Sequence, residues 1–149
     1  MGMPDQAVKL LLDTHIVLWT VLDAPELTRS ARKLMQDADT VFVSSVSLWK
    51  VAITAANGKL PVNIDHLLAE LRASAFLPLP VIWDHAVALR GLPPLHGDPF
   101  DRMLVARAMT EPMHLVTHDA HLAASSPLVM VVRAKHFKSF GTACSRLPL

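Results

Sequence analysis

Short apolar runs alternate with amphipathic segments along this chain, and the alternation predicts strands and helices in turn. Residues 8–12 form a short run that is apolar apart from Lys9, which is typical of a strand buried on both faces. Similar runs predict four further strands, at residues 40–44, 76–79, 113–117 and 128–132. The gaps between these runs are long enough to hold helices.

The segments between the runs carry helix-start signals. Thr28 stands before the amphipathic segment 29–37 as a capping residue would. Asp98 precedes Pro99, which suits the first helical position because the missing N–H costs nothing there. Asp84 is expected to cap a short helix. The expected helices, by residue number, are 16–22, 29–37, 46–56, 64–73, 84–90 and one that begins at 99, with a further short helix between the last two strands.

Strands that alternate with helices predict an α/β fold, a three-layer sandwich in which helices flank a central, mainly parallel sheet. The length of 149 residues and the hydrophobic content of 52% suit one domain with one core. We expect this domain to span residues 1–132. Residues 133–149 are expected to form a basic C-terminal tail, since all thirteen acidic residues lie at or before Asp119. Such a tail can attract phosphates nonspecifically or be a poorly ordered terminus.

Composition argues against a membrane or secreted protein. No apolar stretch approaches the roughly 20 residues that a membrane-spanning helix needs, although the mean hydropathy of +0.35 is high. The first residues lack the basic segment and apolar run of a secretory signal. The single cysteine, Cys144, cannot form an internal disulfide. These features predict a cytoplasmic protein, with the excess apolar content in buried strands and an oligomer face.

Three aspartates lie where predicted strands end or a predicted helix begins. Asp13 directly follows the first strand, Asp119 follows the fourth, and Asp101 lies in the first turn of the helix that Pro99 opens. Ligand sites of parallel sheets lie at the carboxyl ends of the strands. Three carboxylates there would repel one another unless a cation lay between them, and Mg²⁺ or Mn²⁺ suits oxygen ligands. Each aspartate alone is also explained as a helix cap.

Five separated segments, in a fixed order, carry a stronger signal than any of them alone. They are Leu10-Leu-Leu-Asp-Thr-His-Ile-Val-Leu-Trp, Val43-Ser-Ser-Val-Ser-Leu-Trp-Lys-Val-Ala-Ile, Gly58-Lys-Leu-Pro, Asp98-Pro-Phe-Asp-Arg-Met-Leu-Val-Ala-Arg-Ala and Leu115-Val-Thr-His-Asp. Together they resemble the PIN-domain family, and most of all its VapC-type toxins. The resemblance extends over about residues 8–132.

The resemblance implies a function and a set of site residues. It implies a PIN-like fold and a metal-dependent endoribonuclease, the toxin of a toxin–antitoxin pair. This enzyme would hydrolyse RNA phosphodiester bonds with water activated by Mg²⁺ or Mn²⁺, form a homodimer and be neutralised by a cognate antitoxin protein. By motif, Asp13, Asp101 and Asp119 match three of the four acidic positions and would be both catalytic and metal-binding. Asp98 matches an additional aspartate and is a further metal-ligand candidate.

The chain departs from the family at the fourth acidic position, where Lys50 replaces the usual glutamate. Opposite charges about 5 Å apart interact by roughly 3 kcal/mol at an effective dielectric constant of 20, so this change could lower cation affinity on the order of a hundredfold. Lys50, which we include among the catalytic candidates, has three open placements. It can pair with Asp13 or Asp101 in place of a cation, turn away from a weaker three-aspartate site, or snorkel to solvent.

This departure leaves an alternative function of a different class. The chain could be a PIN-fold module whose catalysis is impaired by Lys50 and which binds an antitoxin or RNA without cleaving. A nuclease that acts on DNA or flap structures is a third interpretation, for which the chain is short.

Overall fold

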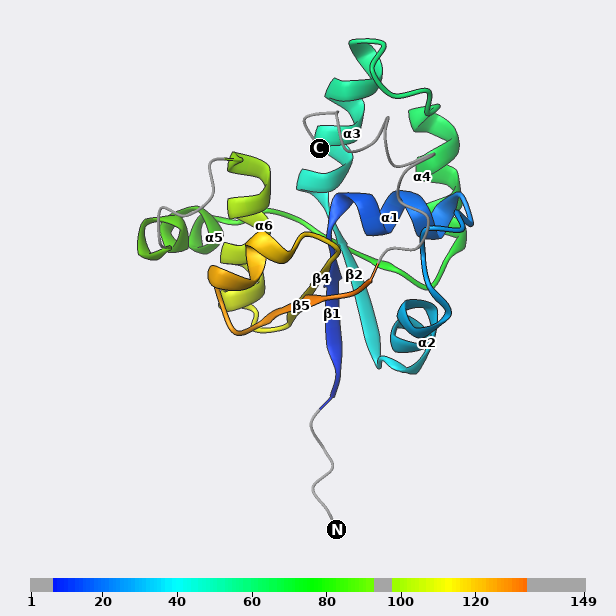
Figure 1. Cartoon of the computed structure of the whole chain (residues 1–149). Helices are drawn as coiled ribbons and strands as arrows, with labels where there is room; N and C mark the ends of the chain where they lie inside the picture. Colours follow the sequence, from blue (N-terminus) through cyan, green and yellow to red (C-terminus); the bar gives the residue numbers. More distant parts are fainter. Residues whose placement is uncertain (1–6, 93–97, 134–149) are drawn as a thin grey trace.

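A five-stranded parallel sheet forms the middle of the computed structural model, which describes residues 7–92 and 98–133 (Figure 1). The strands are β1 Lys9–Leu12, β2 Thr40–Ser44, β3 Leu77–Leu79, β4 His114–Thr117 and β5 Val129–Val131. Their order across the sheet is β3-β2-β1-β4-β5. The chain therefore builds outward from β1 to β3 and then returns to place β4 on the other side of β1. This return makes the boundary between β1 and β4 the switch point of the sheet.

Helices cover both faces of the sheet, and the predicted three-layer α/β sandwich is confirmed. One face is covered by α1, α2 and α4, and the other by α5 and α6 (Figure 1). The helices are α1 Thr14–Val21, α2 Arg29–Asp37, α3 Ser45–Ala56, α4 Ile64–Ala73, α5 Trp83–Ala88 and α6 Pro99–Thr110, with short 3₁₀ helices η1 Leu89–Gly91 and η2 Ala120–Ala124. None of the described helices is long and apolar enough to cross a membrane.

The three leucines of β1 follow one another without a polar residue because their side chains enter two cores. Leu10 and Leu12 pack into the cluster formed with α1, α2 and α4, whereas Leu11 packs into the cluster formed with α6. All three leucines are fully buried. Alternate side chains of a strand point to opposite faces, so a strand between two helix layers has no polar face. Asp13 directly follows this strand, whose one charged residue, Lys9, is exposed at its start.

Local capping signals set several helix starts as expected. The Thr28 hydroxyl accepts a hydrogen bond from the Ala31 N–H at 3.2 Å, so its predicted role as the cap of α2 is confirmed. The expected capping role of Asp84 is wrong. The Ile82 N–H instead donates to Nδ1 of the buried His85 at 3.1 Å, and Asp84 lies within the first turn of α5.

The predicted division into a domain and a basic tail stays a prediction. Strand β5 ends at Val131, which agrees with a domain that ends near residue 132. Residues 134–149, which hold most of the predicted tail and Cys144, lie outside the described residues.

Candidate functional site

Asp13 lies at the carboxyl end of β1, beside the switch point of the sheet. Its N–H donates to the Val116 carbonyl of β4 at 2.9 Å, which fixes the backbone between the two strands. Its Oδ1 accepts from the Thr14 N–H and its Oδ2 accepts from the Thr117 hydroxyl, each at 2.6 Å. The side chain is 5% exposed and caps α1, where the partial positive charge of the helix end favours a carboxylate. This position is where a parallel sheet places ligand-binding side chains.

One hydroxyl links Asp13 to Asp119. The Thr117 Oγ1 donates to Asp13 and accepts from the Asp119 N–H at 3.1 Å. Asp119 caps η2 through a 2.9 Å hydrogen bond from the His121 N–H. Two of the predicted aspartates are thus joined across β1 and β4 by the fully buried Thr117. Sequence reasoning gave Thr117 no role, although a hydroxyl at the end of an apolar strand and two residues before an aspartate was a usable signal.

Replacing Thr117 with valine tests this link. Valine has nearly the same shape but leaves Oδ2 of Asp13 and the Asp119 N–H without this partner. Because the loss of one partner from a buried polar pair costs about 1–3 kcal/mol, we expect the free energy of unfolding to fall by that amount. Urea unfolding measures it, with Thr117→Ser as the matched control that keeps the hydroxyl. Equal stability of the valine variant and the parent protein would contradict the proposed link.

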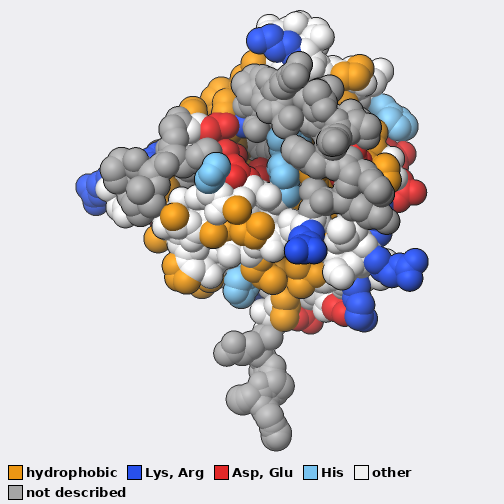
Figure 2. Space-filling view, viewed as in Figure 1, with side chains coloured by type: hydrophobic (Ala, Val, Ile, Leu, Met, Phe, Trp, Pro, Cys, Tyr) orange, Lys and Arg blue, Asp and Glu red, His pale blue; other side chains and the backbone are white. Residues whose placement is uncertain are grey.

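His118 reports on the electrostatics between the two aspartates. Burial and the nearby His15 lower the pKa of His118, while Asp13 and Asp119 act in the opposite direction. The His15 and His118 rings contact edge to face, with centroids 4.7 Å apart. Figure 2 shows acidic and histidine side chains close together on the face that it presents. Asp13 and Asp119 therefore both act to raise the pKa of the His118 imidazole.

The other two predicted aspartates lie at the start of α6. Asp98 caps this helix, because its Oδ1 accepts from the Phe100 N–H at 2.8 Å and from the Asp101 N–H at 3.5 Å. Pro99 follows at the first helical position, so both predicted start signals of α6 are confirmed. Asp101 lies in the first turn and is 7% exposed. The capping interpretation of Asp98 is thus correct, and its role as a metal ligand stays a prediction.

Lys50 is buried within α3 and forms an ion pair. Its side chain is 2% exposed, which rules out snorkelling to solvent. Its Nζ lies 2.7 Å from Oδ2 of Asp98, whose side chain is 23% exposed. The same Nζ lies 5.2 Å from the centroid of the Phe100 ring, a distance that permits a cation–π contact. Asp98 is a partner that sequence reasoning had not named, since Asp13 and Asp101 were the expected ones.

The predicted aspartates have the chemistry that a divalent ion needs, but their side chains are not grouped as a metal site. Asp13, Asp101 and Asp119 supply carboxylate oxygens, the ligands that hard cations prefer. Each carboxylate oxygen has two lone pairs, so the hydrogen bonds to Asp13 and Asp119 leave room for further contacts. Within residues 7–92 and 98–133, however, no three His, Cys, Asp or Glu side chains form a group that could hold a metal ion.

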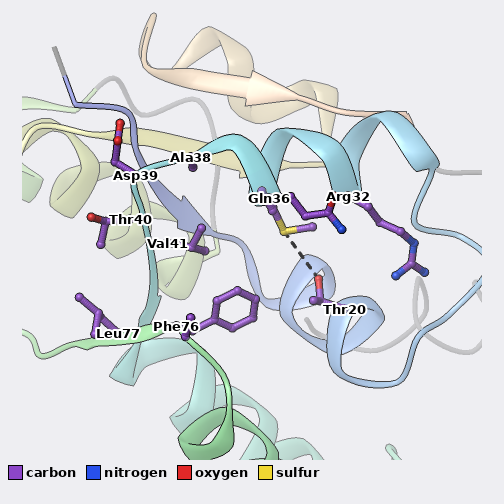
Figure 3. A pocket seen from close by; sticks show the side chains of 11 residues that line it. Thr20, Arg32, Gln36, Ala38, Asp39, Thr40, Val41, Phe76 and Leu77 are labelled. Atoms are coloured by element: carbon purple, nitrogen blue, oxygen red, sulfur yellow. Dashed lines mark hydrogen bonds between the residues drawn. The ribbon is translucent and has the colours of Figure 1, made fainter. Parts of the chain in front are cut away.

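A cavity of about 450 Å³ lies away from these residues, between α2 and the amino-terminal ends of β2 and β3 (Figure 3). Val41 and Phe76 contribute apolar side chains to it, and Arg32 and Asp39 contribute charged ones. Neither Lys50 nor any of the predicted aspartates lines this cavity. It is therefore separate from the candidate site.

Comparisons with known proteins agree with the fold. The family model of the PIN domain matches residues 10–125. Ribonuclease VapC22 of Mycobacterium tuberculosis is 30% identical over 118 residues, covering 76% of this chain and 88% of that protein. Among solved structures, VapBC2 from Rickettsia felis bound to a promoter DNA fragment matches with a TM-score of 0.63 and 15% identity, over 86% of this chain and 100% of that one. A toxin–antitoxin complex from Klebsiella pneumoniae matches with a TM-score of 0.57 and 21% identity, over 82% and 96%.

Proposed function

The chain belongs to the PIN-domain family, and from this premise we propose that it is a VapC-type toxin, an endoribonuclease of a toxin–antitoxin pair. The observation that carries the proposal is the buried Asp13 at the switch point of the sheet, joined through Thr117 to Asp119. Both aspartates lie within the segment that the family model matches. The similarity to Ribonuclease VapC22 supports RNA as the substrate.

Three aspartates of this chain would hold the metal ion. PIN-domain ribonucleases generally depend on divalent metal, and we propose Mg²⁺ or Mn²⁺ held by Asp13, Asp101 and Asp119. When bound, such an ion makes a coordinated water a stronger nucleophile and stabilises charge on the phosphate oxygens. Thr117 would fix the rotation of the Asp13 carboxylate through its 2.6 Å hydrogen bond, which makes it a positioning residue.

Asp98 and Lys50 have a different part in this proposal. Asp98 already has a contact on each carboxylate oxygen, to the helix N–H groups on one and to Lys50 on the other. We therefore propose Asp98 as the partner of Lys50. Lys50 would act on the charge of the site and is not itself a metal ligand, since an ammonium has no lone pair to donate.

The proposed partners are RNA, a cognate antitoxin protein and a second copy of this chain in the cytoplasm. The toxin–antitoxin complexes among the solved structures of the same fold support an antitoxin. Exposed apolar side chains supply surface for protein contacts: Trp83 is 90% exposed, and Trp49, Ile82 and Val87 are exposed as well. Such side chains are more common at interfaces than on free surfaces.

A second candidate function, a binding module without catalysis, is also supported by an observation. The buried Lys50 at a position where the family has an acid, together with the lack of a ready metal-holding group among the described residues, favours an impaired module that binds RNA or an antitoxin without cleaving. The two functions differ in one observable: new RNA ends appear only with the enzyme.

Controlled expression in a bacterium tests the proposed function. We expect induction of this chain to stop growth and to produce new RNA 5′ ends, and Asp101→Asn to abolish both effects. Sequencing of RNA ends before and after induction measures this, with Asp65→Asn, an exposed aspartate in α4, as the control variant. Growth arrest that persists in Asp101→Asn, or arrest without new RNA ends, would contradict an aspartate-dependent ribonuclease and favour the binding module.

A further inference from the structure

Glu26, in the turn between α1 and α2, is a buried carboxylate for which the described residues supply no partner. Its side chain is 0% exposed, and within residues 7–92 and 98–133 neither of its oxygens accepts a hydrogen bond. A carboxylate that loses its hydration without a compensating contact is strongly destabilising. The position therefore requires a positive charge that the described part of the chain does not supply.

The arginines of α2 do not supply this charge. Arg32 has other partners, because its Nη1 lies 2.9 Å from Oδ1 of Asp23 and its Nη2 donates to the Ala24 carbonyl at 3.0 Å. Arg29 is exposed at the start of α2 and does not hydrogen-bond to the Glu26 oxygens. The counter-charge of Glu26 therefore has to come from a segment outside the described residues.

The described chain ends beside this turn. Val132 packs against the core cluster that contains Leu27. Arg133 and Thr28 line one cavity of about 400 Å³, whose other lining residues come from α2 and the end of β5. Thr28 is only two residues after Glu26. Since each residue of an extended chain spans up to about 3.3–3.6 Å, the residues that follow Arg133 can reach the turn between α1 and α2.

Residues 134–149 have the charge and the apolar side chains that this surface lacks. They contain three Lys or Arg residues and no Asp or Glu. The first two are Lys135 and Lys138, and Phe137 stands between them. The cavity beside the turn is lined in part by apolar side chains, among them Leu34 of α2. One short basic segment can therefore match both the buried carboxylate and the cavity.

We propose that the segment that follows Arg133 docks across the turn between α1 and α2, where Lys135 and Lys138 supply the counter-charge of Glu26 and Phe137 enters the adjoining cavity. The occupant is this chain's own tail, because a segment tethered at the edge of the cavity has a high effective concentration there. This docking does not depend on the proposed nuclease function. It holds the first two lysines of the tail against the domain, so they are not free to attract phosphates.

Thermal unfolding of the full-length chain tests the pairing. Lys135→Gln combined with Lys138→Gln leaves Glu26 buried without a counter-charge, so we expect the melting temperature to fall by about 5 °C or more. In the Glu26→Gln background the same two changes should have no effect, because no charge remains to be compensated. Arg146→Gln, later in the same tail, is the matched control and should leave both backgrounds unchanged.

Limited digestion of the folded chain with trypsin tests the docking even if the double lysine variant fails to fold. We expect cleavage after Lys135 and Lys138 to be about tenfold slower in the parent protein than in Glu26→Gln, because loss of the pair releases the segment. Cleavage after Lys59, an exposed lysine in the turn that follows α3, is the internal reference and should not change.

Three results would overturn the docking. The first is a higher melting temperature for Glu26→Gln than for the parent protein, with no effect of the lysine changes, which would show that the carboxylate has no partner in the tail. The second is equal trypsin cleavage after both lysines in the parent and Glu26→Gln. The third is a melting temperature that rises with protein concentration only in chains that keep Glu26, which would assign the counter-charge to a second copy.

Discussion

Replacing Asp13 with asparagine is expected to lower the rate of metal-dependent RNA cleavage about 100-fold or more. Outer partners of metal ligands already affect activity by about 10- to 100-fold, and a direct ligand should affect it at least as much. Asparagine keeps the size of the side chain and one oxygen that can accept from the Thr14 N–H, so the cap of α1 is retained. The loss of rate would therefore come from the removed charge and from the changed contact at Oδ2, where Thr117 would face an amide N–H₂ that cannot accept its hydrogen bond.

The control for this experiment is Asp37→Asn, a variant of an exposed aspartate that pairs with Lys33 on α2. It removes the same charge far from the site and should leave the cleavage rate unchanged. Single-turnover cleavage of one RNA with saturating Mn²⁺ compares the variants. A rate for Asp13→Asn within a few-fold of the parent protein would exclude Asp13 from the metal site.

Replacing Asp98 with asparagine is expected to have the second large effect, a loss of stability. The asparagine oxygen can still cap α6, but Lys50 would remain buried without its counter-charge. Removal of one partner from a buried ion pair typically costs about 3–5 kcal/mol, and because Asp98 is 23% exposed we expect about 3 kcal/mol. Chemical unfolding of the parent protein and the variant measures the difference.

A double-mutant cycle separates the ion pair from other effects at these positions. Lys50→Met combined with Asp98→Asn leaves no uncompensated charge, so it should be more stable than Asp98→Asn alone. Two destabilisations that simply add would show that Lys50 and Asp98 do not depend on each other. That result would contradict a structural ion pair between α3 and α6.

Local signals were sufficient for much of the fold. The bounds of α2, β2 and α4 agree with the residue ranges expected from the sequence, because each of these segments has a clear periodicity and a polar residue at its start. Asp84 shows the limit of the same reasoning. A capping-type residue marks a helix start only if no other side chain takes the role, and at α5 the buried His85 takes it.

The aspartates were easier to predict than their partners. Asp13 and Asp119 follow apolar strands, and the general behaviour of parallel sheets predicts that their side chains lie at one edge. The partner of Lys50 depends instead on how α3 packs against the start of α6, because the two paired residues lie 48 positions apart in the sequence. A long side chain can reach several acids, so only the packing of the helices selects Asp98.

The most direct test of the account is cleavage of a mixed RNA panel by the purified, antitoxin-free protein over a range of Mn²⁺ concentrations, beside Asp13→Asn. We predict that cleavage requires Mn²⁺, is abolished by a chelator and is lost in Asp13→Asn. A parent protein that binds these RNAs but leaves them intact at every Mn²⁺ concentration, or cleavage that survives Asp13→Asn, would contradict it.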